Sequence, residues 1–127
     1  MNREIKFRGR LVNSKEWTEG NLCIRVDGNY IITPDETVLG KYGKVDKETV
    51  GQYIGLHDKN GKEIYEGDIV KITGSKGIDI GKVIYEYNGF TVDVMNMDRF
   101  YGRVHLLEKF TEVIGNIYDN PELLGGE

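Results

Sequence analysis

The stretch Asp46–Ile72 reads DKETVGQYIGLHDKNGKEIYEGDIVKI, and it carries the clearest structural signals in the chain. Its first part, Thr49–Leu56, is rich in β-branched and aromatic residues, which favour a half-buried strand. The segment Asp58–Gly61 follows, in which Asp and Asn favour turn geometry and glycine can adopt the positive φ that closes a loop. The stretch therefore predicts a strand that ends in a tight hairpin loop.

The second half of this stretch extends, turns and extends again. Glu63–Tyr65 continues the hairpin, Glu66–Asp68 turns the chain, and Ile69–Ile72 has the composition of the next strand. We expect Gly61 or Gly67 to have a positive φ, because a side chain there would strain a tight turn. Replacing either glycine by valine is expected to cost about 1–2 kcal/mol of folding free energy or more.

Further strand signals lie on both sides of this stretch. Alternation of apolar and basic residues predicts a first strand with one wet face. The apolar face holds Ile5, Phe7 and Leu11, and the solvent face holds Lys6, Arg8 and Arg10. Asp27-Gly28 and Asn88-Gly89 each separate two strand-like runs, which is the strongest short-range signal of a two-residue hairpin loop. A final strand is expected over Val113–Tyr118.

These signals amount to about seven or eight short strands and no long amphipathic helix, which is typical of an all-β sandwich or barrel. The segment Tyr65–Val70 also resembles the turn-then-strand segment of SH3-like barrels. We therefore predict a mainly β protein. An SH3-like barrel is expected in residues 46–127, with an N-terminal β-hairpin region in residues 1–45 packed against it as one compact unit.

The composition is that of one ordinary globular domain. The chain has 127 residues, of which 39% are hydrophobic and 30% charged. No apolar run approaches the roughly 20 residues that cross a bilayer, so no membrane partner is expected. The single Cys23 has no second cysteine with which to form an internal disulfide. We expect residence in the reducing cytoplasm of the host cell.

Charge is distributed unevenly along the chain. The net charge is −4, but residues 1–15 carry five basic residues against Glu4, and residues 108–127 carry five acidic residues against Lys109. From this asymmetry we predict an interaction surface made of Arg3, Lys6, Arg8, Arg10, Leu123 and Leu124. The acidic tail either docks on the first strand of a neighbouring subunit, which would make a homo-oligomer, or both ends are simply solvated.

Signals for catalysis and for metal binding are weak. The Asp58 loop superficially resembles a calcium loop, but the fifth, sixth and twelfth loop positions, which require an acidic or amide ligand, a glycine and a Glu, hold Lys62, Glu63 and Ile69. His57 and His105 are isolated from each other and from any metal-ligand motif. We therefore predict no catalytic residue, no metal and no cofactor, and expect that the protein is not an enzyme.

Several motifs together resemble the YopX family of small phage and prophage proteins. They are TVGQY, DKNGKEIY and EGDIVK within the central stretch, the opening Arg3–Arg8, and the ending Glu112–Tyr118 with Asn120–Leu124. Lys47 stands where the family often has proline. The resemblance implies a phage-derived cytoplasmic protein with an SH3-like C-terminal part and a homo-oligomeric state. It implies no biochemical activity, because the family has none established.

Two functional hypotheses remain. The first is a non-enzymatic protein-interaction or self-assembling module, whose partner is a second copy or a host or phage protein. The second is a small β-barrel that binds nucleic acid, with Tyr85 and Tyr87 on one strand face and Lys71 and Lys82 nearby. The acidic net charge disfavours this nucleic-acid alternative.

Overall fold

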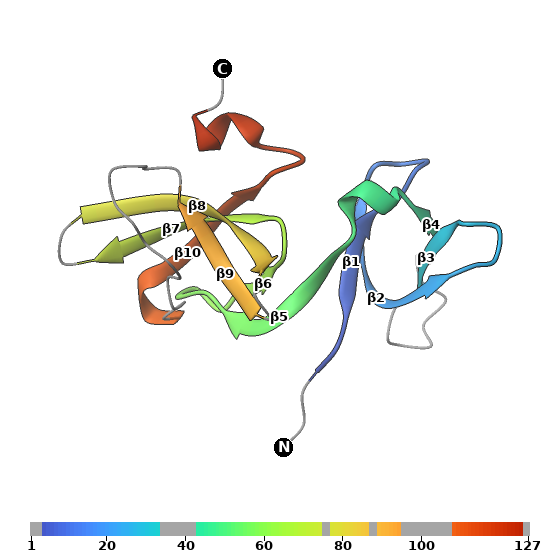
Figure 1. Cartoon of the computed structure of the whole chain (residues 1–127), viewed down its shortest axis with the longest axis horizontal. Helices are drawn as coiled ribbons and strands as arrows, with labels where there is room; N and C mark the ends of the chain where they lie inside the picture. The colour runs from blue at the N-terminus through green and yellow to red at the C-terminus, as the bar shows by residue number, and fades with distance from the viewer. Residues whose placement is uncertain (1–3, 34–42, 75–76, 87–88, 95–107, 126–127) are drawn as a thin grey trace. The chain divides into compact units, whose positions relative to one another are not determined.

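The chain forms β-strands joined by turns (Figure 1). The computed structural model describes residues 4–33, 43–74, 77–86, 89–94 and 108–125. Within these ranges there are three short 3-10 segments and no α-helix. The predicted all-β class is confirmed.

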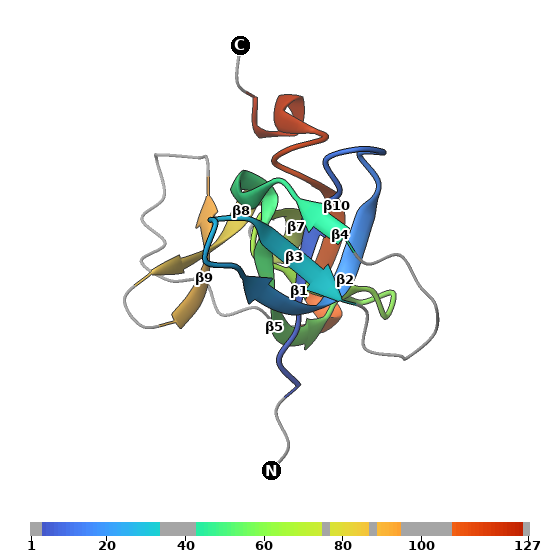
Figure 2. The ribbon, with the colours of Figure 1, turned by 90° about the vertical axis from the view of Figure 1, so that its right-hand side faces the viewer.

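The chain divides into two compact units, Met1–Gly55 and Leu56–Glu127. Among the described residues of the first unit, five antiparallel strands lie in the order β4-β3-β2-β1-β5. They are β1 (Phe7–Arg10), β2 (Trp17–Ile24), β3 (Tyr30–Thr33), β4 (Gly43–Val45) and β5 (Gly51–His57), whose last two residues belong to the second unit. Figure 2 shows β3 beside β4 in this sheet.

The short strand β4 is bonded on both of its edges. One edge pairs with β3, and the other meets the end of β1 through a bridge between Val45 and Leu11. Val12 N also donates a hydrogen bond to Lys44 O at 3.1 Å. The chain therefore returns to its first strand, and Val12 is brought next to β4.

The core of the first unit forms where β1, β3 and β4 meet. Ile32 is 0% exposed and Val45 is 2% exposed. A Cβ built at Gly9 would lie 3.1 Å from Ile32 Cδ1 and from Val45 Cβ, so the backbone of β1 approaches these side chains closely. Glycine permits this approach because it has no side chain to displace them.

The segment before β5 is tied to β1 through Thr49. Its hydroxyl donates to Asp46 O at 2.7 Å and accepts from Arg10 N at 2.9 Å. Thr49 ends the 3-10 segment η1 (Lys47–Thr49), whose N-cap is Asp46. The Asp46 side chain accepts a hydrogen bond from Glu48 N at 3.1 Å, so its carboxylate is engaged at the start of η1.

The predicted hairpin at Asp27-Gly28 is present, but its loop is longer than expected. Arg25 N donates to Asn29 O, which closes a loop of three residues, Val26 to Gly28. Gly28 N donates to Arg25 O, and Gly28 has a φ of +91°. A three-residue loop of this kind, a turn followed by a glycine of positive φ, is another common hairpin connection. It is one residue longer than the predicted two-residue loop.

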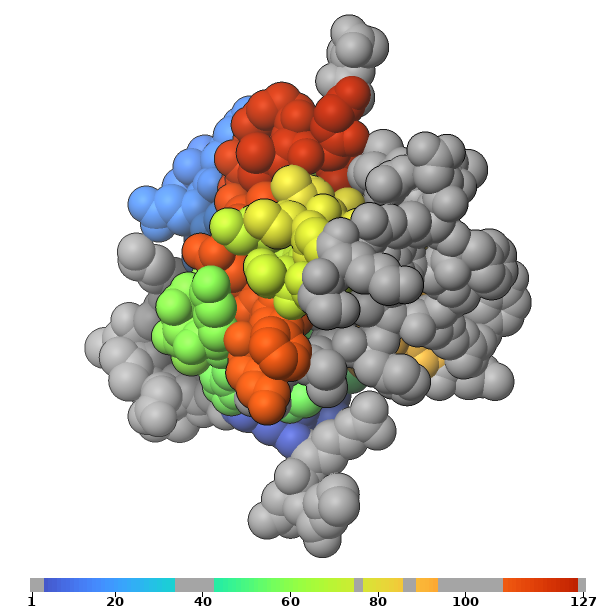
Figure 3. All heavy atoms as spheres, turned by 90° about the vertical axis from the view of Figure 1, so that its left-hand side faces the viewer, coloured from blue at the N-terminus to red at the C-terminus, as the bar shows by residue number. Residues whose placement is uncertain are grey.

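The second unit contains the hairpin strand β6 (Glu63–Tyr65) and an antiparallel sheet in the order β10-β7-β8-β9. The strands of this sheet are β7 (Asp68–Gly74), β8 (Gly77–Glu86), β9 (Gly89–Val94) and β10 (Thr111–Asn116). The 3-10 segment η2 (Glu108–Phe110) precedes β10, and η3 (Pro121–Leu124) follows it and lies against β8 (Figure 3).

The predicted strands of this unit are confirmed, with small shifts of their ends. The last strand spans Thr111–Asn116 and so begins and ends two residues before the predicted Val113–Tyr118. Glu86 pairs with Gly89, as expected of a hairpin, although residues 87 and 88 lie outside the described residues. The described strands leave the sheet open, with β10 and β9 at its edges. The SH3-like barrel therefore stays a prediction.

The central turns of the second unit are structural, as predicted. Gly61 and Gly67 have φ values of +85° and +95°. The Asp58 carboxylate, 5% exposed, accepts hydrogen bonds from Asn60 N, Lys62 N and Val113 N at 2.8 to 2.9 Å. This side chain thus closes its own loop and also holds the start of β10.

Burial and hydrogen bonding act in opposite directions on the pKa of Asp58. Burial disfavours the charged form and raises the pKa. The backbone N–H donors of Val113, Lys62 and Asn60, together with the charge of Lys62, stabilise the carboxylate and lower it. The net effect is a pKa below the usual value of 3.8.

Candidate functional site

The predicted basic stripe on the first strand is wrong at Arg8. This side chain is only 8% exposed, and its guanidinium carbon lies 4.9 Å from the centre of the Trp17 ring. Arg10 lies over the same ring at 5.9 Å. A flat guanidinium stacks well on an aromatic ring. Trp17 pairs with Arg10 from the neighbouring strand β2. Its ring therefore covers the face of β1 that alternation predicts to be exposed to solvent.

Lys6 is partly covered in the same way. Its ammonium lies 5.5 Å from the centre of the Tyr53 ring and 3.6 Å from a Glu4 carboxylate oxygen. Its side chain is 17% exposed. This face of the first unit is therefore a layer of basic and aromatic side chains, in place of a solvated row of cations. Arg3 lies outside the described residues.

Leu123 and Leu124, the other predicted surface residues, belong to η3 in the second unit and are half-buried. A Cβ built at Gly115 would lie 2.9 Å from Leu123 Cδ1, so Leu123 packs against the backbone of β10 in its own chain. Asn116 N donates to the Asn120 side chain at 3.2 Å, and Asn120 N donates to Asn116 O at 2.8 Å. The tail is thus attached to its own unit.

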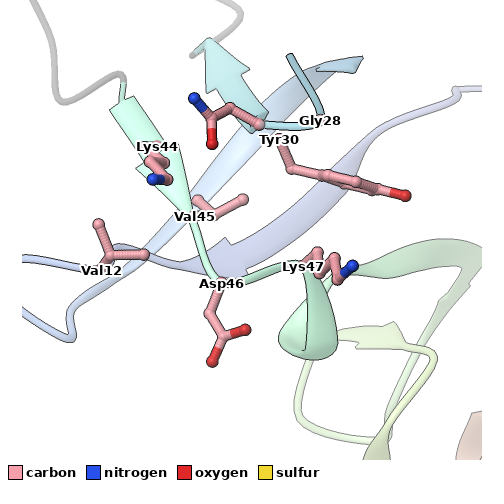
Figure 4. A pocket seen from close by; sticks show the side chains of 8 residues that line it. Val12, Gly28, Tyr30, Lys44, Val45, Asp46 and Lys47 are labelled. Carbon is pink, nitrogen blue, oxygen red and sulfur yellow. The ribbon is translucent and has the colours of Figure 1, made fainter. Parts of the chain in front are cut away.

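The structure reveals a site that the sequence analysis missed. A hollow of about 270 Å³ opens in the first unit where β4 runs into η1 (Figure 4). It is lined by Val12, Gly28, Asn29, Tyr30, Lys44, Val45, Asp46 and Lys47. In Figure 4, Val45 lies at the centre, with Val12 and Lys44 on one side and Tyr30 and Lys47 on the other.

A second, smaller hollow adjoins the first. It has a volume of about 150 Å³, and it is lined by Arg10, Leu11, Val12, Lys15 and Asp46. Val12 and Asp46 line both, so the two hollows are neighbours, and we call them together the Val12 groove. Every residue that lines it belongs to the first unit.

The Val12 groove combines an apolar floor with positive charge. Val45 and Tyr30 pair across β4 and β3, and Val12 is 42% exposed above them. The cations of the groove are Arg10, Lys15, Lys44 and Lys47, against the single carboxylate of Asp46, which gives a local charge of +3. This is a concentrated positive site on a chain of net charge −4.

Exposed apolar side chains extend this surface. Ile24 pairs with Tyr30 from β2 and is 57% exposed. Val26, at the tip of the same hairpin, is fully exposed. Exposed apolar side chains near a charged hollow are typical of surfaces that protein partners cover.

Lys15 has an unusual backbone conformation. Its φ is +64°, and among the described residues other than glycine it alone has a positive φ. It ends the turn between β1 and β2, where Lys15 N donates to Leu11 O and Leu11 N donates to Glu16 O. Glycine fits such a position with less strain, so the sequence keeps a cation here at some cost in stability.

The described residues that line the groove include no histidine or cysteine, and no hydroxyl nucleophile among them is paired with a base. In the part of the chain that the structure describes, no group of three or more His, Cys, Asp or Glu side chains is placed to hold a metal ion. The chemistry that the groove offers is attraction of an anion and burial of an apolar group.

The residues of the nucleic-acid alternative do not form one surface. Lys82 and Tyr85 are three positions apart on β8 and so face opposite sides of the sheet. Tyr85 is 56% exposed, and Phe90 packs edge-on against its ring at 5.0 Å. Lys71 lies 3.5 Å from a Glu112 carboxylate oxygen. Tyr87 lies outside the described residues.

None of the helical segments in the described part of the chain has the length and hydropathy of a membrane span.

Comparison with known proteins supports the resemblance noted in the sequence. A family model described as YopX protein matches residues 6–125. The SPbeta prophage-derived uncharacterized protein YopX of Bacillus subtilis strain 168 is 42% identical over an alignment of 71 residues, and the match covers 52% of this chain and 53% of that protein. The chain thus spans about half the length of that relative.

A solved structure has a similar fold. It is the crystal structure of protein EF1440 from Enterococcus faecalis, with a TM-score of 0.61 and 26% sequence identity. The match covers 97% of this chain and 99% of that one.

Proposed function

We propose that this chain, which belongs to the YopX family, is a non-enzymatic protein-interaction or self-assembling module. The observation that carries the proposal is the Val12 groove, a hollow with an apolar floor and a local charge of +3 on an acidic protein. Apolar contact supplies affinity at such a surface, and charge selects the partner and speeds the encounter.

The groove is a better candidate for this role than the stripe on the first strand. Arg8 is buried against Trp17, so replacing it by glutamate would disturb the fold as well as any interface. Lys44 and Lys47 are exposed, and their replacement changes charge at the surface alone. They are the residues with which to test association.

The test uses a double variant of the groove, in which Lys44 and Lys47 are both replaced by glutamate. The control is a double variant in which two exposed lysines of the second unit, Lys59 and Lys109, are replaced by glutamate. Light scattering at low and at high salt measures self-association. Lysine cross-linking in the producing cell, followed by mass spectrometry and scored at the exposed Lys15, which both variants retain, measures contacts with other proteins. We expect the groove variant to lose a salt-sensitive complex that the control retains.

Equal behaviour of the two variants in both measurements would contradict the proposal. A monomer at every salt concentration with no cross-link at Lys44 or Lys47 would also contradict it.

We also propose that the C-terminal part forms an SH3-like barrel and that the protein is located in the host cytoplasm. The turn at Glu66–Asp68 and the strand β7 that follows it support the barrel, because this is the segment that resembles SH3-like proteins. Closure requires hydrogen bonds along the outer edge of β9, which backbone amide NOEs and exchange rates would detect. Cell fractionation tests the location.

A further inference from the structure

We infer that the Val12 groove binds a short acidic segment of a partner protein, in which one aliphatic side chain lies between two carboxylates. This inference rests on the proposed interaction function and names the chemistry of the partner.

The size of the groove limits what can enter it. The larger hollow has about 270 Å³, just below the roughly 300–1,000 Å³ of sites that enclose a drug-sized ligand or cofactor. One leucine or isoleucine side chain with its backbone fits this volume, and Val12, Tyr30 and Val45 provide the apolar contact.

The charges of the groove call for carboxylates on both sides of that apolar side chain. Lys44 and Lys47 line the larger hollow, and Lys15 lines the smaller one beyond Val12. Among the described residues, neither the Lys44 nor the Lys47 ammonium lies in an ion pair with a carboxylate.

Asp46, the one acid among the described residues that line the groove, offsets a single positive charge and leaves the groove at +3. The Asp46 carboxylate caps η1 by accepting from Glu48 N, and Figure 4 shows it directed away from Tyr30 and Lys44. Carboxylates from a partner would therefore meet lysines that no carboxylate in the described part of the chain pairs with.

Nucleic acid fits these observations less well than an acidic peptide does. A net charge of −4 repels a long polyanion, whereas a segment with two carboxylates is affected much less. The ring of Tyr30 is half-buried in the floor of the groove, and a base needs an exposed ring face on which to stack.

The acidic C-terminal residues of a second copy of this chain are also weaker candidates for binding in the groove. They combine Glu122 with Leu123 and Leu124, but Leu123 is already packed against Gly115 of its own chain. Docking in the groove of another copy would require that contact to break first.

The test uses three blocked pentapeptides with the full chain: acetyl-Gly-Glu-Leu-Glu-Gly-amide, its Gln-Leu-Gln analogue and its Glu-Ser-Glu analogue. Amide chemical shifts of the isotope-labelled protein locate the bound peptide and give its Kd. We expect the Glu-Leu-Glu peptide to shift Val12, Lys44 and Lys47, and both analogues to bind at least about tenfold more weakly.

Protein variants give the matched control. Lys44→Gln with Lys47→Gln should weaken the Glu-Leu-Glu peptide about tenfold or more, while Lys59→Gln with Lys109→Gln should leave its Kd unchanged. Added salt should weaken binding to the wild-type chain.

Four results would overturn the inference: equal binding of the Gln-Leu-Gln analogue, shifts confined to residues outside the groove, equal affinity for free 4-methylpentanoate, or displacement of the peptide by oligothymidylate. The third would indicate a small-molecule site and the fourth a nucleic-acid site.

Failure here and failure of the proposed function give different patterns. Cross-links at Lys44 or Lys47 without peptide binding would leave the interaction module standing with another partner chemistry. Peptide binding with no groove-dependent association of the protein in the cell would leave the site standing without that function.

Discussion

Asp58 and Val113 are 55 positions apart in the sequence, and the Asp58 carboxylate accepts a hydrogen bond from Val113 N at 2.9 Å. The same carboxylate accepts from Asn60 N and Lys62 N within its own loop. The residue type of Asp58 predicts only a local turn. Its side chain nevertheless also holds β10, the last strand of this sheet in sequence order.

Asp58→Ala is expected to lower the free energy of unfolding by about 2–4 kcal/mol, because three N–H groups lose a charged acceptor. Urea denaturation followed by circular dichroism measures the change. Asp27→Ala is the matched control, since Asp27 accepts from Asn29 within an exposed hairpin loop of the first unit. A loss no larger than that of the control would show that the Val113 contact contributes little.

The stabilisation by Asp58 should depend on pH. Its pKa in the folded protein is lowered, so the contribution is present above the unfolded-state value of about 3.8 and disappears as the pH falls through the folded value. The stability difference between the wild-type chain and Asp58→Asn should be constant from pH 7 to 5 and shrink below pH 4. A difference that grows on acidification would contradict this assignment.

Gly81→Ala should destabilise the second unit by about 1–3 kcal/mol. A Cβ at Gly81 would lie 2.5 Å from Asp93 O and 2.8 Å from Val92 Cγ1 on the neighbouring strand, so β8 and β9 would have to separate. Gly89→Ala, in the same pair of strands, meets nothing within 4 Å and serves as the control. Thermal unfolding of the two variants should differ clearly, and equal melting temperatures would show that the ladder adjusts without cost.

Lys15→Gly should stabilise the first unit by about 0.5–1 kcal/mol, because glycine adopts a φ of +64° with less strain than lysine. Lys15→Ala keeps the strain and should give no such gain. If Lys15 serves the Val12 groove, both variants should weaken the Glu-Leu-Glu peptide. A glycine variant that is no more stable than the alanine variant would remove the argument from strain.

Features that depend on neighbours in the sequence were predictable. The loop at Asp58–Gly61, the turn at Gly67 and the presence of a first strand follow from local conformational preference and from a period of two. The sequence does not indicate what lies on each face. Alternation places Arg8 on one side of β1 but does not show that Trp17 of β2 covers it.

The site depends on such distant pairing even more strongly. Lys44 to Lys47 are adjacent in the sequence, yet they form a hollow only because the bridge between Leu11 and Val45 brings Val12 beside them. A register between strands more than thirty residues apart leaves no local pattern of residue types. For the same reason the closure of a barrel could not be judged from strand signals alone.

The position of β10 has a consequence for synthesis of the chain. β10 pairs with β7, and β7 contains the apolar residues Ile69, Val70 and Ile72. In the order β10-β7-β8-β9, this edge of β7 pairs with β10 alone. Until β10 leaves the ribosome, the edge is therefore unpaired and can pair with another nascent chain. A chain truncated after Phe110 should therefore sediment as aggregate where the full chain stays in the supernatant. Folding of the second unit must wait until β10, Thr111–Asn116, has been translated.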